Sequence, residues 1–191
     1  SFTVAHPLKL YDCSLITDGA AAVLLASEER AKEISKKPVW IAGLGLATDT
    51  MRITERESLT TIRSTREAAR IAYKMAGIGP SDVDVAAVHD CFTIAEILAY
   101  EDLGFCEKGE GGRLIAAKET YLDGRIPVNV DGGLKSKGHP LGATGVSMAV
   151  EITKQLRGEA EKRQVKDAAV GLSHNVGGTG QVVAVHIFRR E

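Results

Sequence analysis

Two short motifs in this chain of 191 residues combine titratable side chains with residues typical of tight turns. One is His89-Asp90-Cys91-Phe92, and the other runs from Lys137 to Gly145 and contains His139. Each motif falls where a predicted strand or loop meets a predicted helix, and a helix N-terminus favours nearby negative charge. Two imidazoles and a thiol at such junctions predict chemistry that passes through a thiolate or an enolate.

The local sequence suggests how each group could work. Gly138 and Pro140 together set the backbone around His139, and Gly142 is expected to start the next helix. An imidazole beside a helix N-terminus should stay neutral, so that it can accept a thiol proton or donate a hydrogen bond to a carbonyl. Cys91 also precedes a helix, so we expect its thiolate to be favoured. His89 directly follows a predicted strand, where ligands of α/β sheets usually bind.

Simpler interpretations exist for the same residues. A lone histidine is more often a core or loop residue, and Cys91 alone is typical of a small buried side chain. The segment Ser173 to Gly180 contains His174 and reads as a glycine-rich turn. The histidines and cysteines lack the paired spacing of common zinc sites, and no strand leads into a Gly-x-Gly-x-x-Gly loop. We therefore expect neither a metal nor a dinucleotide.

Composition limits the class of protein. The chain is 44% apolar with a formal net charge of -1, and it has no basic run that would predict nucleic-acid binding. No apolar run is long enough to cross a bilayer, and no secretory signal precedes the first polar residues. Cys13, Cys91 and Cys106 are too widely spaced for a disulfide framework, which favours a reducing, cytoplasmic location. Because the chain opens at Ser1, it is either a trimmed polypeptide or the C-terminal part of a larger one.

The hydrophobic pattern predicts alternating strands and helices. Five segments have the length and apolar content of buried strands: residues 20–26, 39–46, 82–88, 168–173 and 182–188. Helices are expected after Ser27, from Ser64 or Thr65 to Met75, and over 92–103, 113–120 and 142–157, with a glycine-rich loop over 128–138. The last two strands should form a hairpin. This order predicts a layered α/β domain with a mixed, mostly five-stranded sheet flanked by helices.

These motifs resemble the C-terminal half of thiolases, most closely the sterol-carrier-protein-type thiolases and their archaeal relatives. The resemblance covers essentially the whole chain. Thr17 to Val23 is similar to the segment that closes the family's N-terminal domain, and Asn129 to Gly145 matches the loop and helix that carry the family's catalytic histidine. His-Asp-Cys-Phe is this subgroup's variant of Asn-Glu-Ala-Phe. The resemblance implies a thiolase-like α/β/α domain over residues 37–191, preceded by the tail end of the N-terminal domain over residues 1–36.

The resemblance also implies roles for single residues. His139 would activate a nucleophilic cysteine and help to hold the thioester oxygen, His89 would take the oxyanion-hole role, and Cys91 would move the proton of the α-carbon. His174 and Val176 stand where most thiolases have Cys-x-Gly, so the role of His174 is open, and we expect it to line the pocket. The other residues expected to line the substrate or oxyanion region are Asn175, Gly177, Gly178, Gly138 and Phe92.

The implied activity is that of an acyl-CoA acyltransferase. It would catalyse Claisen condensation of acyl-CoA with acetyl-CoA, or thiolytic cleavage of 3-ketoacyl-CoA, with acetoacetyl-CoA as the expected compound. Coenzyme A thioesters would be the substrates, and no separate cofactor is implied. The family's nucleophilic cysteine belongs to the N-terminal half, which this chain lacks. We therefore expect the chain alone to be inactive, its partners to be that half, in cis or in trans, and further copies in a homo-dimer or tetramer.

Three alternatives remain open from the sequence. The chain could be a relative of the β-ketoacyl synthases, although these differ around the first histidine and lack the Cys91 motif. It could be a non-catalytic binding or scaffold subunit of a larger acyl-CoA-handling complex. It could also act alone with Cys91 as the nucleophile, which predicts an acetylated thiol after exposure to acetyl-CoA.

Overall fold

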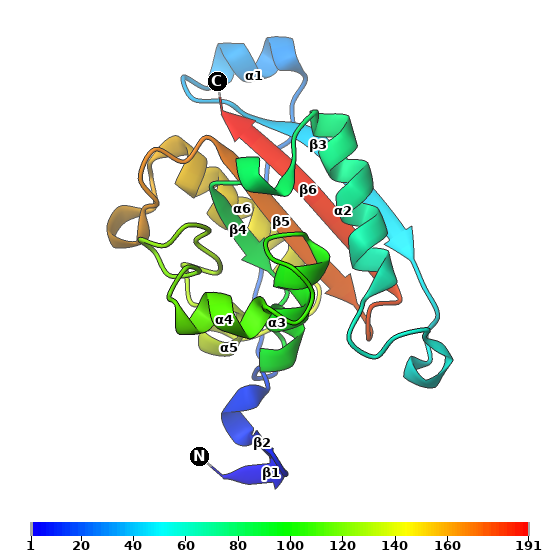
Figure 1. Ribbon diagram of the computed structural model, residues 1–191. Helices are drawn as coiled ribbons and strands as arrows, with labels where there is room; N and C mark the ends of the chain where they lie inside the picture. The colour runs from blue at the N-terminus through cyan, green and yellow to red at the C-terminus, as the bar shows by residue number, and fades with distance from the viewer. Residues whose placement is uncertain (1, 191) are drawn as a thin grey trace.

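A mixed four-stranded sheet forms the centre of the computed structural model, which describes residues 2–190. The strands lie in the order β3-β6-β5-β4, as Figure 1 shows. β3 pairs antiparallel with β6, β6 pairs antiparallel with β5, and β5 runs parallel to β4. Their bounds are β3 (Val39–Thr48), β4 (Val85–Val88), β5 (Val170–Gly177) and β6 (Val182–Arg190). The mixed α/β fold and the terminal hairpin are thus confirmed.

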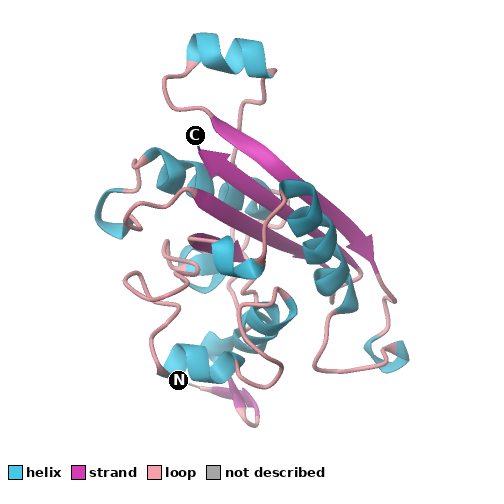
Figure 2. Cartoon of the chain, turned by 45° about the horizontal axis from the view of Figure 1, so that its top comes forward, coloured by secondary structure: helices cyan, strands magenta, loops and turns pink. Residues whose placement is uncertain are grey.

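Helices and turns connect these strands (Figure 2). The α-helices are α1 (Glu28–Ile34), α2 (Arg63–Ala76), α3 (Thr93–Asp102), α4 (Gly111–Ala116), α5 (Gly133–Lys137) and α6 (Thr144–Arg157). Short 3-10 helices cover Leu10–Asp12, Ile53–Glu55, Pro80–Asp82 and Glu161–Arg163, and a small hairpin pairs β1 (Thr3–Ala5) with β2 (Leu8–Lys9). Among residues 2–190 no helix combines the length and apolar character that a membrane span needs.

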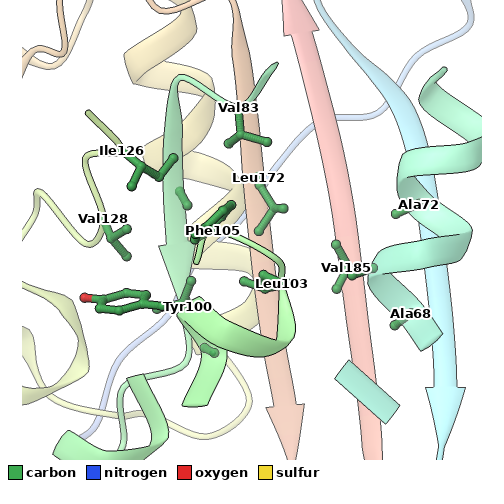
Figure 3. Packing of buried hydrophobic residues seen from close by; sticks show 14 of the residues in the cluster. Ala68, Ala72, Val83, Tyr100, Leu103, Phe105, Ile126, Val128, Leu172 and Val185 are labelled. Atoms are coloured by element: carbon green, nitrogen blue, oxygen red, sulfur yellow. The ribbon is translucent and has the colours of Figure 1, made fainter. Parts of the chain in front are cut away.

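Helices cover both faces of the sheet because successive side chains of a strand point to opposite sides. Ala86 and Val88 of β4 belong to a core with α2 and α3, whereas Val85 and Ala87 belong to a second core with α6. Figure 3 shows the first core, with labelled side chains from the sheet, from α2 and from the end of α3 gathered between the layers. The α/β/α layering is therefore as predicted.

Close contact between α2 and β3 depends on small residues. A side chain at Gly45 would overlap the backbone carbonyl of Ala68, and Gly43 faces Ala72 and Ala76 in the same way. The helix buries a stripe of alanines against these glycines, so its axis can approach the strand. This packing explains why two glycines interrupt an otherwise apolar strand.

One predicted strand is wrong. Residues 20–26 have no regular structure, and Leu24 and Leu25 are 83% and 73% exposed. A strand needs a neighbour for its backbone N–H and C=O groups, and none of residues 2–190 pairs with this segment. The main sheet therefore has four of the five expected strands. β3 forms its edge and is only partly buried.

Several helix boundaries also differ. α2 begins after Ile62, since the hydroxyls of the expected caps are engaged elsewhere: Ser64 donates to the Gly180 carbonyl and Thr65 pairs with His174. α4 covers residues 111–116 instead of 113–120, and α5 lies inside the segment expected to be loop. α6 begins two positions after Gly142.

Candidate active site

His89 and His139 lie next to each other at the carboxyl end of β4. His89 directly follows Val88, the last residue of the strand, while His139 comes from the loop between α5 and α6. Their rings meet edge to face, with centroids 4.9 Å apart and planes at 84°. The carboxyl ends of parallel strands are where α/β sheets usually bind ligands. The fold therefore brings together the two histidines that the sequence singled out.

His89 is held by a neighbour on the next strand. Its Nδ1 lies 3.0 Å from Oδ1 of Asn175 on β5, and the residue is only 4% exposed. A side chain at Gly145 would contact the Asn175 amide at 2.8 Å, so the glycine makes room for that amide beside α6. Burial lowers the pKa of His89 to about 4, the Asn175 bond acts in the opposite direction, and His139 lowers it slightly further. His89 is thus neutral at physiological pH.

His139 is oriented by the first residue of α6. Its Nδ1 lies 2.7 Å from Thr144 Oγ1, and that hydroxyl donates to the Pro140 carbonyl at 3.2 Å. Because a carbonyl can only accept, the hydroxyl accepts in turn from Nδ1–H, which leaves Nε2 with a free lone pair. Burial lowers the pKa of His139, and Asp90 opposes that shift. The direction of this shift favours the neutral imidazole, with burial as the main cause.

Cys91 differs from the expectation. The thiol is partly buried and precedes Phe92, the N-cap of α3. Burial raises the pKa of Cys91, and the neighbouring Asp90 carboxylate raises it further, outweighing the backbone N–H groups that lower it. The predicted favouring of the thiolate by the helix is therefore wrong for this chain. Cys91 is a thiol at neutral pH, and once deprotonated its thiolate is a correspondingly stronger base.

His174 is buried at the core of the domain. It is 1% exposed, and its Nε2 lies 3.0 Å from Thr65 Oγ1 on α2, on the face of the sheet opposite to Asn175. Burial lowers its pKa to about 3. Its Nδ1 has no hydrogen-bond partner among residues 2–190. The imidazole thus packs beneath α2, and its predicted pocket-lining role stays a prediction.

The remaining predicted residues lie in loops, a strand end and a helix cap. Gly138 is buried with φ +89°, and a side chain there would overlap Thr17. Phe92 is 48% exposed. Gly177 ends β5, and Gly178 follows it in the hairpin turn with φ +60°. Their lining and oxyanion roles stay predictions. The described part of the chain contains no group of three or more His, Cys, Asp or Glu residues that could hold a metal ion.

Two polar residues near His89, Asp90 and Asn129, were not predicted from the sequence to belong to the site. Asp90 is 3% exposed, and its carboxylate accepts a hydrogen bond from the Leu134 N–H at 2.8 Å. Asn129 accepts from the Val88 N–H at 2.8 Å and donates to Glu96 at 3.0 Å. Asp90 lies inside the first motif, and Asn129 begins the segment Asn129 to Gly145 that resembles the thiolases. The available signal at each position was a charged or amide side chain between residues expected to be buried. Both fasten the strand end that carries His89.

Comparison with known proteins agrees with this geometry. Residues 45–190 match the family model described as thiolase C-terminal domain-like. The chain belongs to this thiolase family. It is 54% identical to the acetyl-CoA acetyltransferase of Methanothermobacter thermautotrophicus over 190 residues, which are 100% of this chain and 50% of that protein. It is 44% identical to sterol carrier protein 2 of Rattus norvegicus, over 95% of this chain and 34% of that protein.

Solved structures show the same thiolase fold. The Ltp2-ChsH2(DUF35) aldolase matches with a TM-score of 0.87 and 26% identity, over 99% of this chain and 49% of that one. The Bacillus anthracis acetyl-CoA acetyltransferase matches in fold with a TM-score of 0.68 and 20% identity, over 94% of this chain and 38% of that one. This thiolase domain therefore spans about half the length of the acetyl-CoA acetyltransferase relative.

Proposed function

We propose that this thiolase domain is the C-terminal half of an acyl-CoA acyltransferase that forms or cleaves acetoacetyl-CoA. The observation that carries the proposal is the edge-to-face pair of His89 and His139 with Cys91 two residues beyond His89. The names and lengths of the relatives support it, because acetyl-CoA acetyltransferases twice as long leave room for a second half. That half supplies the nucleophilic cysteine, in the same polypeptide or in a separate one, within a homo-oligomer.

The first half-reaction is an acyl transfer between two sulfur atoms. His139 Nε2, which carries the free lone pair, accepts the proton of the nucleophilic cysteine. The cysteine sulfur then attacks the thioester carbonyl of acetyl-CoA, the carbon–sulfur bond to coenzyme A breaks, and the departing sulfur takes the proton back from His139. The product is an acetyl-cysteine, and coenzyme A leaves as its thiol.

The second half-reaction forms the carbon–carbon bond. Cys91 first gives its proton to His139 Nε2, which is neutral again after the first half-reaction, and its raised pKa makes the resulting thiolate a strong base. The thiolate then removes an α-proton from a second acetyl-CoA. The enolate carbon attacks the acetyl-cysteine carbonyl, the cysteine sulfur leaves and takes the proton from His139, and acetoacetyl-CoA results. Hydrogen bonds from His89 and its surroundings stabilise the negative oxygen that develops at each stage. Thiolytic cleavage follows the same steps in reverse.

Replacing Cys91 separates the two half-reactions. The C91A variant should keep the exchange of labelled coenzyme A into acetyl-CoA and lose condensation to acetoacetyl-CoA. The assay uses the polypeptide that carries both halves, or this chain assembled with the nucleophile-bearing half. C106A is the matched control, since Cys106 is also partly buried and packs against the core that contains α2 and α3. Condensation by C91A at the parental rate would overturn the proposal, and so would a parental assembly that catalyses neither reaction.

A further inference from the structure

We propose that Asp90 is a positioning residue that fixes the spacing between His139 and the pair formed by His89 and Cys91. The inference deepens the proposed function and rests on it. Asp90 is joined covalently to His89 and Cys91, and its buried carboxylate is fastened to the helix that leads to His139. One side chain thus connects the two segments that carry the reacting groups.

The contact between Asp90 and α5 is tight and directional. Oδ1 accepts from the Leu134 N–H at 2.8 Å, and the N–H of Lys135 also points at the carboxylate. Gly133 stands directly beside it: a side chain at this position would overlap the carboxylate, and the backbone has φ +64°. Gly133 therefore leaves space for the Asp90 carboxylate, and the backbone N–H groups of α5 donate hydrogen bonds to it.

The path from this contact to His139 is short and rigid. α5 ends at Lys137, where the N–H of Gly138 donates to the Leu134 carbonyl at 2.9 Å. Leu134 is therefore bonded through its N–H to Asp90 and through its carbonyl to the residue that precedes His139. We infer that a shift at Leu134 would displace Gly138, and with it the imidazole of His139.

The charge of Asp90 acts on the same two reacting groups. For Cys91, burial raises the pKa most and Asp90 raises it further. For His139, burial lowers the pKa and Asp90 acts in the opposite direction. Other titratable groups also face these sites. His89 meets His139, and Cys13 lies beside Cys91. Asp131, Glu96, Tyr100 and Lys135 surround Asp90 and the cavity behind it. Removing the Asp90 charge should therefore lower the pKa of Cys91 and of His139 together.

Two substitutions separate position from charge. In D90N the new amide oxygen can still accept from the Leu134 N–H, whereas in D90A nothing does. We expect D90A to lose about 100-fold in acyl transfer, the typical cost of misplacing a reacting group by about 1 Å, and D90N to recover most of that loss. The assay uses the assembled enzyme, with folding checked by circular dichroism. E96Q is the control, because Glu96 lines the same cavity and its carboxylate accepts hydrogen bonds from Tyr100 and Asn129 instead of from α5.

A second readout needs no substrate. The rate of Cys91 alkylation by iodoacetamide, followed by peptide mass spectrometry against pH in the full chain, reports the pKa of this thiol. D90N should move the profile to lower pH, and E96Q should leave it in place. If Asp90 had a merely structural role, the pH profile of Cys91 alkylation would be the same in D90N as in the parent. An unchanged profile would overturn the inference, and so would a folded D90A that turns over at the parental rate. An alkylation shift in a protein without acyl transfer would instead refute the proposed function alone.

Discussion

The hydroxyl of Thr144 decides which nitrogen of His139 can act as a base. T144V removes the acceptor that lies 2.7 Å from Nδ1 and keeps the shape of the side chain. Thr144 is 1% exposed, so an Nδ1–H left without this partner is disfavoured, and the neutral ring shifts toward the form with its proton on Nε2. An unsatisfied buried donor costs about 1–3 kcal/mol, so the base-competent form should fall by roughly 5- to 150-fold.

Acyl transfer should fall by the same factor. The assay is the single-turnover rate at which the assembled enzyme becomes acetylated by acetyl-CoA, followed by quenched-flow mass spectrometry near neutral pH. S147A is the matched control, since the Ser147 hydroxyl lies on the same helical turn and donates to the Thr144 carbonyl, away from the imidazole. Acetylation of a stably folded T144V at the parental rate would refute the tautomer argument.

Three further results are expected. G133A should lose about 2 kcal/mol or more of unfolding free energy in urea titrations, because φ is positive there and the Asp90 carboxylate fills the space. G142A is the control, since Gly142 has open space around it, and its unfolding free energy should stay within about 0.5 kcal/mol of the parent. Burial lowers the pKa of His174 to about 3 and that of His89 to about 4, so both rings take up protons more readily in the unfolded chain. The free energy of unfolding should therefore be at its full value above pH 6.5, and each histidine should lower it by up to about 1.4 kcal/mol per pH unit below that. H174Q should show a shallower dependence on pH than the parent. Nitrogen-15 NMR should find the ring proton of His89 on Nδ1 in this chain, because the Asn175 side-chain oxygen accepts from it. When a thioester analogue binds, the Asn175 amide should rotate by half a turn and the proton should move to Nε2. A proton that stays on Nδ1 in the bound state would exclude His89 as the oxyanion donor.

Local signals predicted most of the architecture. The β5–β6 hairpin and α6 follow from apolar periodicity and turn glycines close in sequence, and the structure confirms them. The meeting of His89 and His139 was predictable because each sits at a junction between a strand or loop and a helix, and such junctions gather at one edge of an α/β sheet. The strand predicted over residues 20–26 does not form. An apolar run indicates only that a strand is possible, whereas a strand also needs a neighbour to pair with.

Properties that depend on burial could not be read from the chain. The thiol of Cys91 was expected to ionise readily, yet desolvation and the carboxylate of Asp90 determine its pKa. His174 packs against Thr65 of α2, a residue far away in sequence, and local spacing did not predict this contact. Both outcomes depend on which elements pack together, and that information is absent from local spacing.

The most direct test of the account is to locate the acetyl group after acetyl-CoA is added to the assembled enzyme. Acid quenching, proteolysis and peptide mass spectrometry would assign the modified thiol. The account predicts acetylation of a cysteine outside these 191 residues, abolished when that cysteine is replaced, with Cys91 unmodified. An acetylated Cys91 in this chain alone would contradict the account, because Cys91 would then be the nucleophile and not the base.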